Sequence, residues 1–228
     1  ADLGPAQPDL LIVYDGHNEF YGALGASSNE TLGSWRWVIQ AHLSLIHIRT
    51  YLLLQDFIQW AGSLFNTYLS PSEGTLMERM SRGNIVQHAS PLYFKALDNF
   101  KSNLKQLASI GRRLNVPVLV STQVSNLRDQ PPFVSGEGEV IPSERRDSFR
   151  SQLQHAGLLL SNGAYDSAVA VLKKTIALDS MHAQTYFLLG QCYLRLRDHR
   201  QALQALVKDR DYDNLRFRTS SDFNAAVL

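Results

Sequence analysis

The C-terminal half of the chain contains two copies of one sequence pattern, 34 residues apart. The segment that ends in Ala168 aligns with the segment that ends in Ala202, and both copies are rich in Leu, Ala and Gln. A repeat of this length predicts two helix–turn–helix hairpins, within residues 144–210, that stack to bury a shared core. The two helices of a hairpin cross closely only where side chains are small, and Ala156, Ala168, Gly190 and Ala202 stand at those positions.

The pattern resembles the tetratricopeptide (TPR) repeat. The second copy carries the large residues of that pattern as Tyr186, Leu189, Tyr193 and Leu206. The resemblance implies an all-α segment that binds a protein or peptide partner. Two repeats are fewer than the three or so usually needed for independent stability. We therefore expect contacts with the rest of the chain, or with sequence outside it, to stabilise them.

A strand–helix–strand pattern precedes the repeats. Residues 10–14 and 116–122 are short apolar runs rich in β-branched side chains, which is typical of buried strands in a parallel sheet. Between them, residues 34–65 have mainly helical spacing, and residues 91–114 form the clearest helix, with a serine cap and a proline at its start. This order predicts a right-handed parallel crossover and an α/β fold with a partial doubly wound sheet.

Polar residues gather directly after the first predicted strand. Gly16, His17, Asn18 and Glu19 arrive where ligands sit in open α/β sheets, at the carboxyl end of a strand. Gly16 allows a close backbone approach, and the amide of Asn18 is a donor suited to a developing oxyanion. The alternative interpretation is an ordinary polar loop.

The four residues Gly16-His17-Asn18-Glu19 resemble block III of the SGNH (GDSL-type) hydrolases, Gly-x-Asn-Asp, with Glu19 in place of the usual Asp. The longer run from Pro8 to Gly22 is similar to SGNH-type proteins that also carry TPR repeats. The resemblance implies a flavodoxin-like sheet, with Asn18 and Gly16 as catalytic residues and His17 and Glu19 as substrate-binding residues.

The segment after the second predicted strand, from Gln123 to Phe133, is similar to the same proteins. We interpret Asn126 and Asp129 as further candidates for substrate binding. The alternative is that both are ordinary loop residues and that Arg128 pairs locally with Asp129.

An SGNH esterase also needs a Gly-Asp-Ser nucleophile and a late Asp-x-x-His pair. The chain has no Gly-Asp-Ser, and its only suggestive match to the pair, Asp179 to His182, falls at the junction of the two repeats. We therefore interpret that match as a repeat turn and expect the chain to be an inactive fragment of a longer ester hydrolase with an acyl-serine mechanism. The alternative function is a non-catalytic TPR scaffold with a degenerate SGNH-like domain.

These patterns predict three parts: an SGNH-like α/β part at residues 1–136, two TPR repeats at 144–210, and a return towards the hydrolase domain at 211–228. A net charge of +1 gives no general attraction to nucleic acid. One cysteine excludes a Cys-rich zinc site, and the histidines lack metal-ligand spacing, so we expect no metal and no cofactor. Polar and charged residues interrupt the most apolar region, 38–65, which argues against a membrane span. The compartment stays open, including an extracytoplasmic or anchored location through sequence ahead of Ala1.

Overall fold

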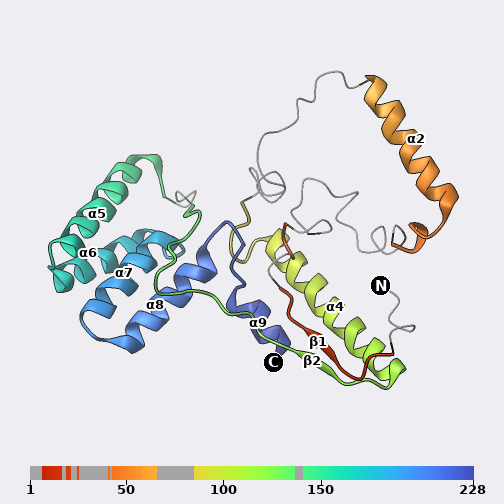
Figure 1. Cartoon of the computed structure of the whole chain (residues 1–228). Helices are drawn as coiled ribbons and strands as arrows, with labels where there is room; N and C mark the ends of the chain where they lie inside the picture. The colour runs from red at the N-terminus through yellow and green to blue at the C-terminus, as the bar shows by residue number, and fades with distance from the viewer. Residues whose placement is uncertain are drawn as a thin grey trace. The chain divides into compact units, whose positions relative to one another are not determined.

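The computed structural model describes residues 7–16, 19–21, 25, 41, 43–65, 85–136 and 141–228. The chain divides into two compact units, one of residues 1–18 with 85–228 and one of residues 19–84. Figure 1 labels their helices and strands.

Helix α2 (Arg49–Phe65) belongs to the 19–84 unit and lies within the region that the sequence predicts as helical. Leu53, Phe57 and Trp60 recur at helical spacing along it and are exposed, and the Phe57 and Trp60 rings are 5.7 Å apart. No helix in the described ranges is long and apolar enough to cross a membrane.

The other unit begins with a small parallel sheet. Strand β1 (Leu11–Val13) pairs with strand β2 (Val118–Val120), and Ile12 stands opposite Leu119. The predicted parallel pairing is confirmed. The larger doubly wound sheet is not shown, because the described residues form these two strands alone.

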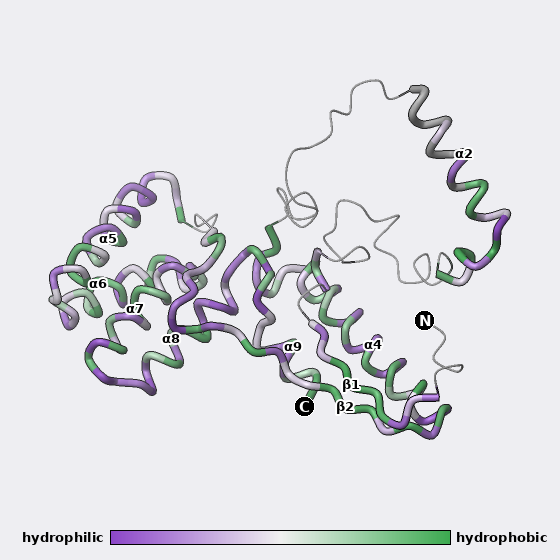
Figure 2. The backbone as a smooth tube through the Cα atoms, in the orientation of Figure 1, coloured by the Kyte–Doolittle hydropathy of each residue, from purple (hydrophilic) through white to green (hydrophobic). Residues whose placement is uncertain are grey.

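Helix α4 (Pro91–Leu114) packs against β2 and has the bounds that the sequence predicts. The Ser90 hydroxyl accepts a 3.2 Å hydrogen bond from the Tyr93 N–H, which satisfies one of the free donors at the helix start. Gly111 lets the helix approach the strand, since a Cβ there would overlap the Val118 side chain. Figure 2 shows the mixed hydrophobic and hydrophilic turns of this helix beside the apolar strands.

The predicted repeat hairpins are confirmed as four helices: α5 (Ser143–Ser161), α6 (Tyr165–Leu178), α7 (Ala183–Arg195) and α8 (His199–Tyr212). The small residues lie in the core as expected, with Ala168 and Ala202 at most 1% exposed. Gly190 is needed for the close crossing of α7 and α8, because an added Cβ would lie 2.5 Å from Leu206. This part of the chain is therefore a TPR-like helical region.

The segment from Asp179 to His182 is the turn between the two hairpins, as predicted. The Asp179 carboxylate accepts a hydrogen bond from the Met181 N–H at 2.9 Å, and His182 Nδ1 accepts one from the Thr185 N–H at 3.3 Å. His182 thus caps the start of α7, which is a structural role.

The C-terminal helix α9 (Ser221–Val227) packs against α4. The Tyr93 hydroxyl donates a 2.6 Å hydrogen bond to Asp222 and lies 2.7 Å from the Ser220 hydroxyl. Burial, followed by the bond to Asp222, raises the pKa of Tyr93. The Arg216 guanidinium lies over the Tyr93 ring, 5.1 Å from its centroid, and its Nε donates to the Val86 carbonyl at 2.7 Å. These contacts join residues 213–227 to α4.

Candidate functional site

The carboxyl end of the small sheet is where the sequence places catalytic residues. Gly16 lies there with φ +138°, and its N–H donates a 2.8 Å hydrogen bond to the Asp15 carboxylate. A Cβ at this position would lie 3.3 Å from the Gln123 side chain and 3.5 Å from the Thr219 hydroxyl. The left-handed backbone and the close neighbours together explain why a glycine stands here.

Asn18 and His17 lie outside the described residues, so the proposed oxyanion donor stays a prediction. Glu19 is described as part of the separate 19–84 unit. The geometry of this edge therefore rests on Gly16 and on what surrounds it.

The edge contains one feature that the sequence does not reveal, the buried side chain of Gln123. Its main chain is fixed by Asn224: the Gln123 N–H donates to Asn224 Oδ1 at 2.8 Å, and Asn224 Nδ2 donates to the Gln123 carbonyl at 3.0 Å. The side chain is 5% exposed, and neither atom of its amide has a hydrogen-bond partner among the described residues. A buried amide without partners costs about 1–3 kcal/mol.

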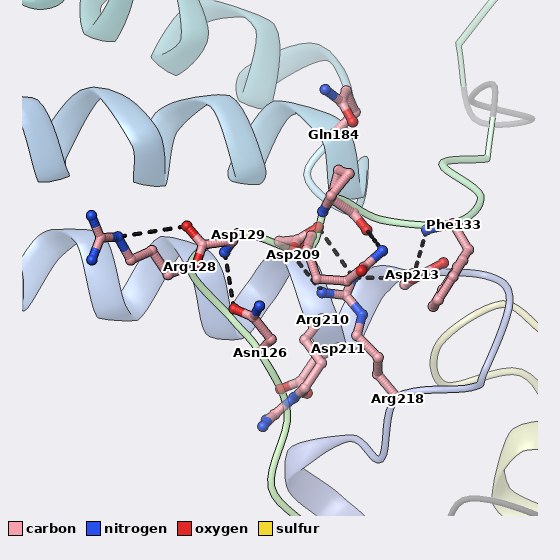
Figure 3. Close-up of polar contacts among 12 residues, drawn as sticks. Asn126, Arg128, Asp129, Phe133, Gln184, Asp209, Arg210, Asp211, Asp213 and Arg218 are labelled. Carbon is pink, nitrogen blue, oxygen red and sulfur yellow. Dashed lines mark hydrogen bonds and ion pairs between the residues drawn. The ribbon is translucent and has the colours of Figure 1, made fainter.

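Asn126 and Asp129 make local contacts. The Asn126 side chain accepts a 3.0 Å hydrogen bond from the Asp129 N–H, and Arg128 pairs with Asp129 at 3.6 Å with both side chains mostly exposed. This is the geometry of a side-chain-capped turn. Figure 3 shows both residues on the segment that continues towards the repeat helices.

That segment, residues 126–136, lies against the TPR-like region without helix or strand and bends at residues 128, 129 and 133. The Gln191 side-chain amide on α7 donates to the Arg128 carbonyl, and the Gln184 N–H at the start of α7 donates to the Ser135 hydroxyl at 2.8 Å. The segment therefore runs in the direction opposite to α7. Its middle contains Pro131 and Pro132, which favour extended backbone and lack N–H donors.

A buried carboxylate, Asp213, holds the second half of the segment. It accepts hydrogen bonds from the Phe133 N–H at 2.9 Å and the Val134 N–H at 3.0 Å, and the Asn214 N–H donates back to the Val134 carbonyl at 2.9 Å. The main chain of Phe133 and Val134 is thus held through its N–H and carbonyl groups. Figure 3 shows the contact between Phe133 and Asp213.

Arg218 completes this anchor. Its guanidinium pairs with Asp213 at 3.0 Å and with Asp209 at 3.1 Å, and it donates to the Gln130 carbonyl at 3.1 Å. The three charged side chains are at most 7% exposed. Burial raises the pKa of Asp209 to about 6, although Arg218 acts in the opposite direction. Removing either partner of such a desolvated ion pair would destabilise the fold, because the other charge would stay buried without compensation.

An open groove lies between α5 and α7. It has a volume of about 520 Å³, and its lining includes Leu153, Gly157 and Leu158 from α5 and Gln184 and Leu188 from α7. An added Cβ at Gly157 would meet nothing within 4 Å. The TPR-like region thus presents one surface of α7 that already holds an extended segment and an adjoining groove that is open.

Comparison with known proteins agrees with the repeat assignment. Residues 140–209 match the family described as anaphase-promoting complex, cyclosome, subunit 3. No curated protein and no solved structure matches the chain. Among the described residues, no group of three or more His, Cys, Asp or Glu side chains is placed to hold a metal ion.

Proposed function

We propose that this chain is a protein-interaction module whose TPR-like helices bind an extended segment of a partner protein. The observation that carries the proposal is the position of residues 126–136. This stretch lies along α7 and is held there by Gln191 at one end and by the Gln184 N–H at the other. The surface of α7 therefore binds a non-helical segment through one main-chain carbonyl and one serine hydroxyl.

The open groove between α5 and α7 offers a second such surface. Its lining combines leucine side chains with the amides of Gln154 and Gln184, which is the mixture that an extended peptide requires: apolar contact for side chains and hydrogen bonds for the backbone. The matched family is described as a subunit of a complex, which agrees with a role in assembly.

The proposal assigns a supporting role to the rest of the unit. Arg218 and Asp213 connect α8 to the extended segment, and Tyr93 connects residues 220–222 to α4. We propose that residues 85–136 and 211–228, with strand β1, support the repeats at 144–210. Two repeats then need no third repeat for stability.

Peptide display tests the proposed function. The whole chain is immobilised, a randomised peptide library is selected on it, and the affinity of an enriched peptide is measured by fluorescence anisotropy. We expect Gly157→Phe, which fills the groove, to weaken binding about tenfold or more. Ala177→Phe, at an exposed position of α6, is the matched control and should bind like the unmodified chain. Enriched peptides that bind both variants equally would remove the groove from the proposal, and failure to enrich any peptide would contradict the function.

A second candidate function, ester hydrolysis, is favoured by the order of elements at the small sheet. β1 and β2 are parallel, α4 lies between them in sequence, and Gly16 stands at the carboxyl end of β1. We propose Asn18 as the oxyanion donor of a longer protein that includes flanking sequence. There, Asn18→Ala should lower turnover of p-nitrophenyl acetate about 100- to 1000-fold with little change in stability. Unchanged turnover would remove the catalytic proposal.

A further inference from the structure

The two repeats differ at one position that faces a bound segment. Gly157 in α5 is 34 residues before Gln191 in α7, so the two residues occupy equivalent places in the repeat. Gln191 reaches out to the Arg128 carbonyl of the extended segment. Gly157 has no side chain and leaves open space at the equivalent place. The first repeat therefore has a recess where the second has a hydrogen-bonding side chain.

The surroundings of this recess are apolar. Leu153, Leu158 and Leu188 line the groove with Gly157, and Leu158 is 56% exposed. A bulky apolar side chain placed over Gly157 would cover leucine surface that now faces water, which is favourable in proportion to the area covered.

One end of the groove carries an arginine. Arg150 lies two helical turns before Gly157 on α5 and contributes to the lining. Its side chain is 56% exposed and pairs with the almost fully exposed Asp147 at 4.0 Å. Such a surface pair contributes little to stability, and the guanidinium of Arg150 is exposed enough to meet a carboxylate of a partner.

We propose that the groove between α5 and α7 binds an extended peptide of a partner protein that carries a bulky apolar residue over Gly157 and an acidic residue at Arg150. This inference rests on the proposed function and names the chemistry of the partner. The seven steps from Arg150 to Gly157 span about 10 Å of helix, which is the reach of about three residues of fully extended chain. In the chain's own segment, seven positions separate Arg128 at Gln191 from Ser135 at Gln184 over the equivalent helical length. The acidic residue thus stands about three to seven positions from the apolar one.

The direction of the peptide follows from the chain's own bound segment. Arg128 lies at Gln191 and Ser135 lies at Gln184, so that segment runs opposite to α7. Helices α5 and α7 are the first helices of two successive hairpins and run the same way. A peptide bound like residues 126–136 therefore places its apolar residue first and its acidic residue towards its C-terminus.

The test selects a randomised peptide library on the whole chain and compares variants of one enriched peptide. We expect enriched peptides to carry Phe, Leu, Met or Trp followed about three to seven positions later by Asp or Glu. Replacing the apolar residue by Ala, or the acidic residue by Lys, should weaken binding about tenfold. Arg150→Glu should weaken the acidic peptide and restore binding of its Lys variant, a reciprocal effect that a misfolded protein would not give.

Three results decide between the claims. The expected pattern with the reciprocal charge effect supports the inference. Enriched peptides of another chemistry, or peptides indifferent to Arg150→Glu, overturn the inference and leave the interaction function standing. Absence of any enriched peptide overturns both. Circular dichroism and thermal unfolding of Arg150→Glu check that its helices are intact.

Discussion

The N–H of Gln184, in the first turn of α7, donates a 2.8 Å hydrogen bond to the hydroxyl of Ser135. The first N–H groups of a helix have no partner within it, so they need one from outside. Here the partner comes from an extended segment that leaves β2 and ends beside the repeats. One polar contact thus joins the TPR-like helices to the strand-bearing part of the unit, through a serine side chain of a segment that is not helical.

The first prediction concerns the two hairpin turns. Gly163 and Arg197 are equivalent in the repeat and both have left-handed backbone, with φ +78° and +60°. Glycine adopts this conformation without cost, whereas other residues lose about 1–2 kcal/mol. Arg197→Gly should therefore raise the free energy of unfolding by about 1 kcal/mol, measured by urea denaturation.

The control for that prediction is a substitution away from glycine at the equivalent turn of the first repeat. Gly163→Ala places a Cβ on the same left-handed backbone and should lower the free energy of unfolding by a similar amount, about 1 kcal/mol. If Arg197→Gly is destabilising while Gly163→Ala is neutral, the two turns are not equivalent.

The second prediction concerns the buried anchor. Arg218→Met removes the guanidinium and leaves the carboxylates of Asp209 and Asp213 buried without their counter-charge. Breaking a buried pair in this way costs about 3–5 kcal/mol. Arg128→Met is the matched control, since its pair with Asp129 is exposed and should contribute less than about 1 kcal/mol. Equal effects of the two substitutions in thermal or urea unfolding would show that Arg218 is not an anchor.

The third prediction concerns pH. Burial raises the pKa of Asp209 to about 6 in the folded chain, above its ordinary value of 3.8. The folded state therefore binds a proton more tightly than the unfolded state, and the contribution of Asp209 to stability falls as pH rises from about 4 to about 6. The size of this loss is on the order of 1–3 kcal/mol.

The comparison with Asp209→Asn isolates that effect, because other carboxylates also titrate in this range. The stability of the unmodified chain minus that of the variant should decrease between about pH 4 and pH 6 and level off above. A difference that grows with pH would mean that the Arg218 guanidinium outweighs desolvation and lowers the pKa of Asp209.

Local signals predicted most of the elements. Ser90 and Pro91 mark the start of α4, and the 34-residue period fixes the four repeat helices and the burial of Ala168 and Ala202. These features depend on neighbours within a helical turn or on a pattern that the sequence states twice. The parallel strands were also predictable, since each is a short apolar run of β-branched residues.

The interaction surface was not predictable in the same way. The sequence places Gln123 to Phe133 at the sheet, with Asn126 and Asp129 as candidates for substrate binding, and it contains no sign that Arg128 and Ser135 lie against α7. Arg218 looks like any surface arginine until Asp209 and Asp213 are placed around it. The burial of Gln123 was likewise not predictable, because its contact residue Asn224 lies about 100 positions later in the chain. Contacts between residues so far apart produce no periodic pattern in a single sequence. The role of Asn18 stays a prediction for the experiment proposed above.

The central claim, that a partner peptide lies between α5 and α7, is tested most directly by photo-crosslinking. The photoreactive residue p-benzoylphenylalanine replaces Leu158, which lines the groove and is 56% exposed. In a second protein it replaces Ala177 on α6. After irradiation with a library-selected peptide, mass spectrometry should find the peptide attached at position 158 and not at position 177. Attachment at position 177 alone, or at neither position while the peptide still binds, would place the partner elsewhere and contradict the account.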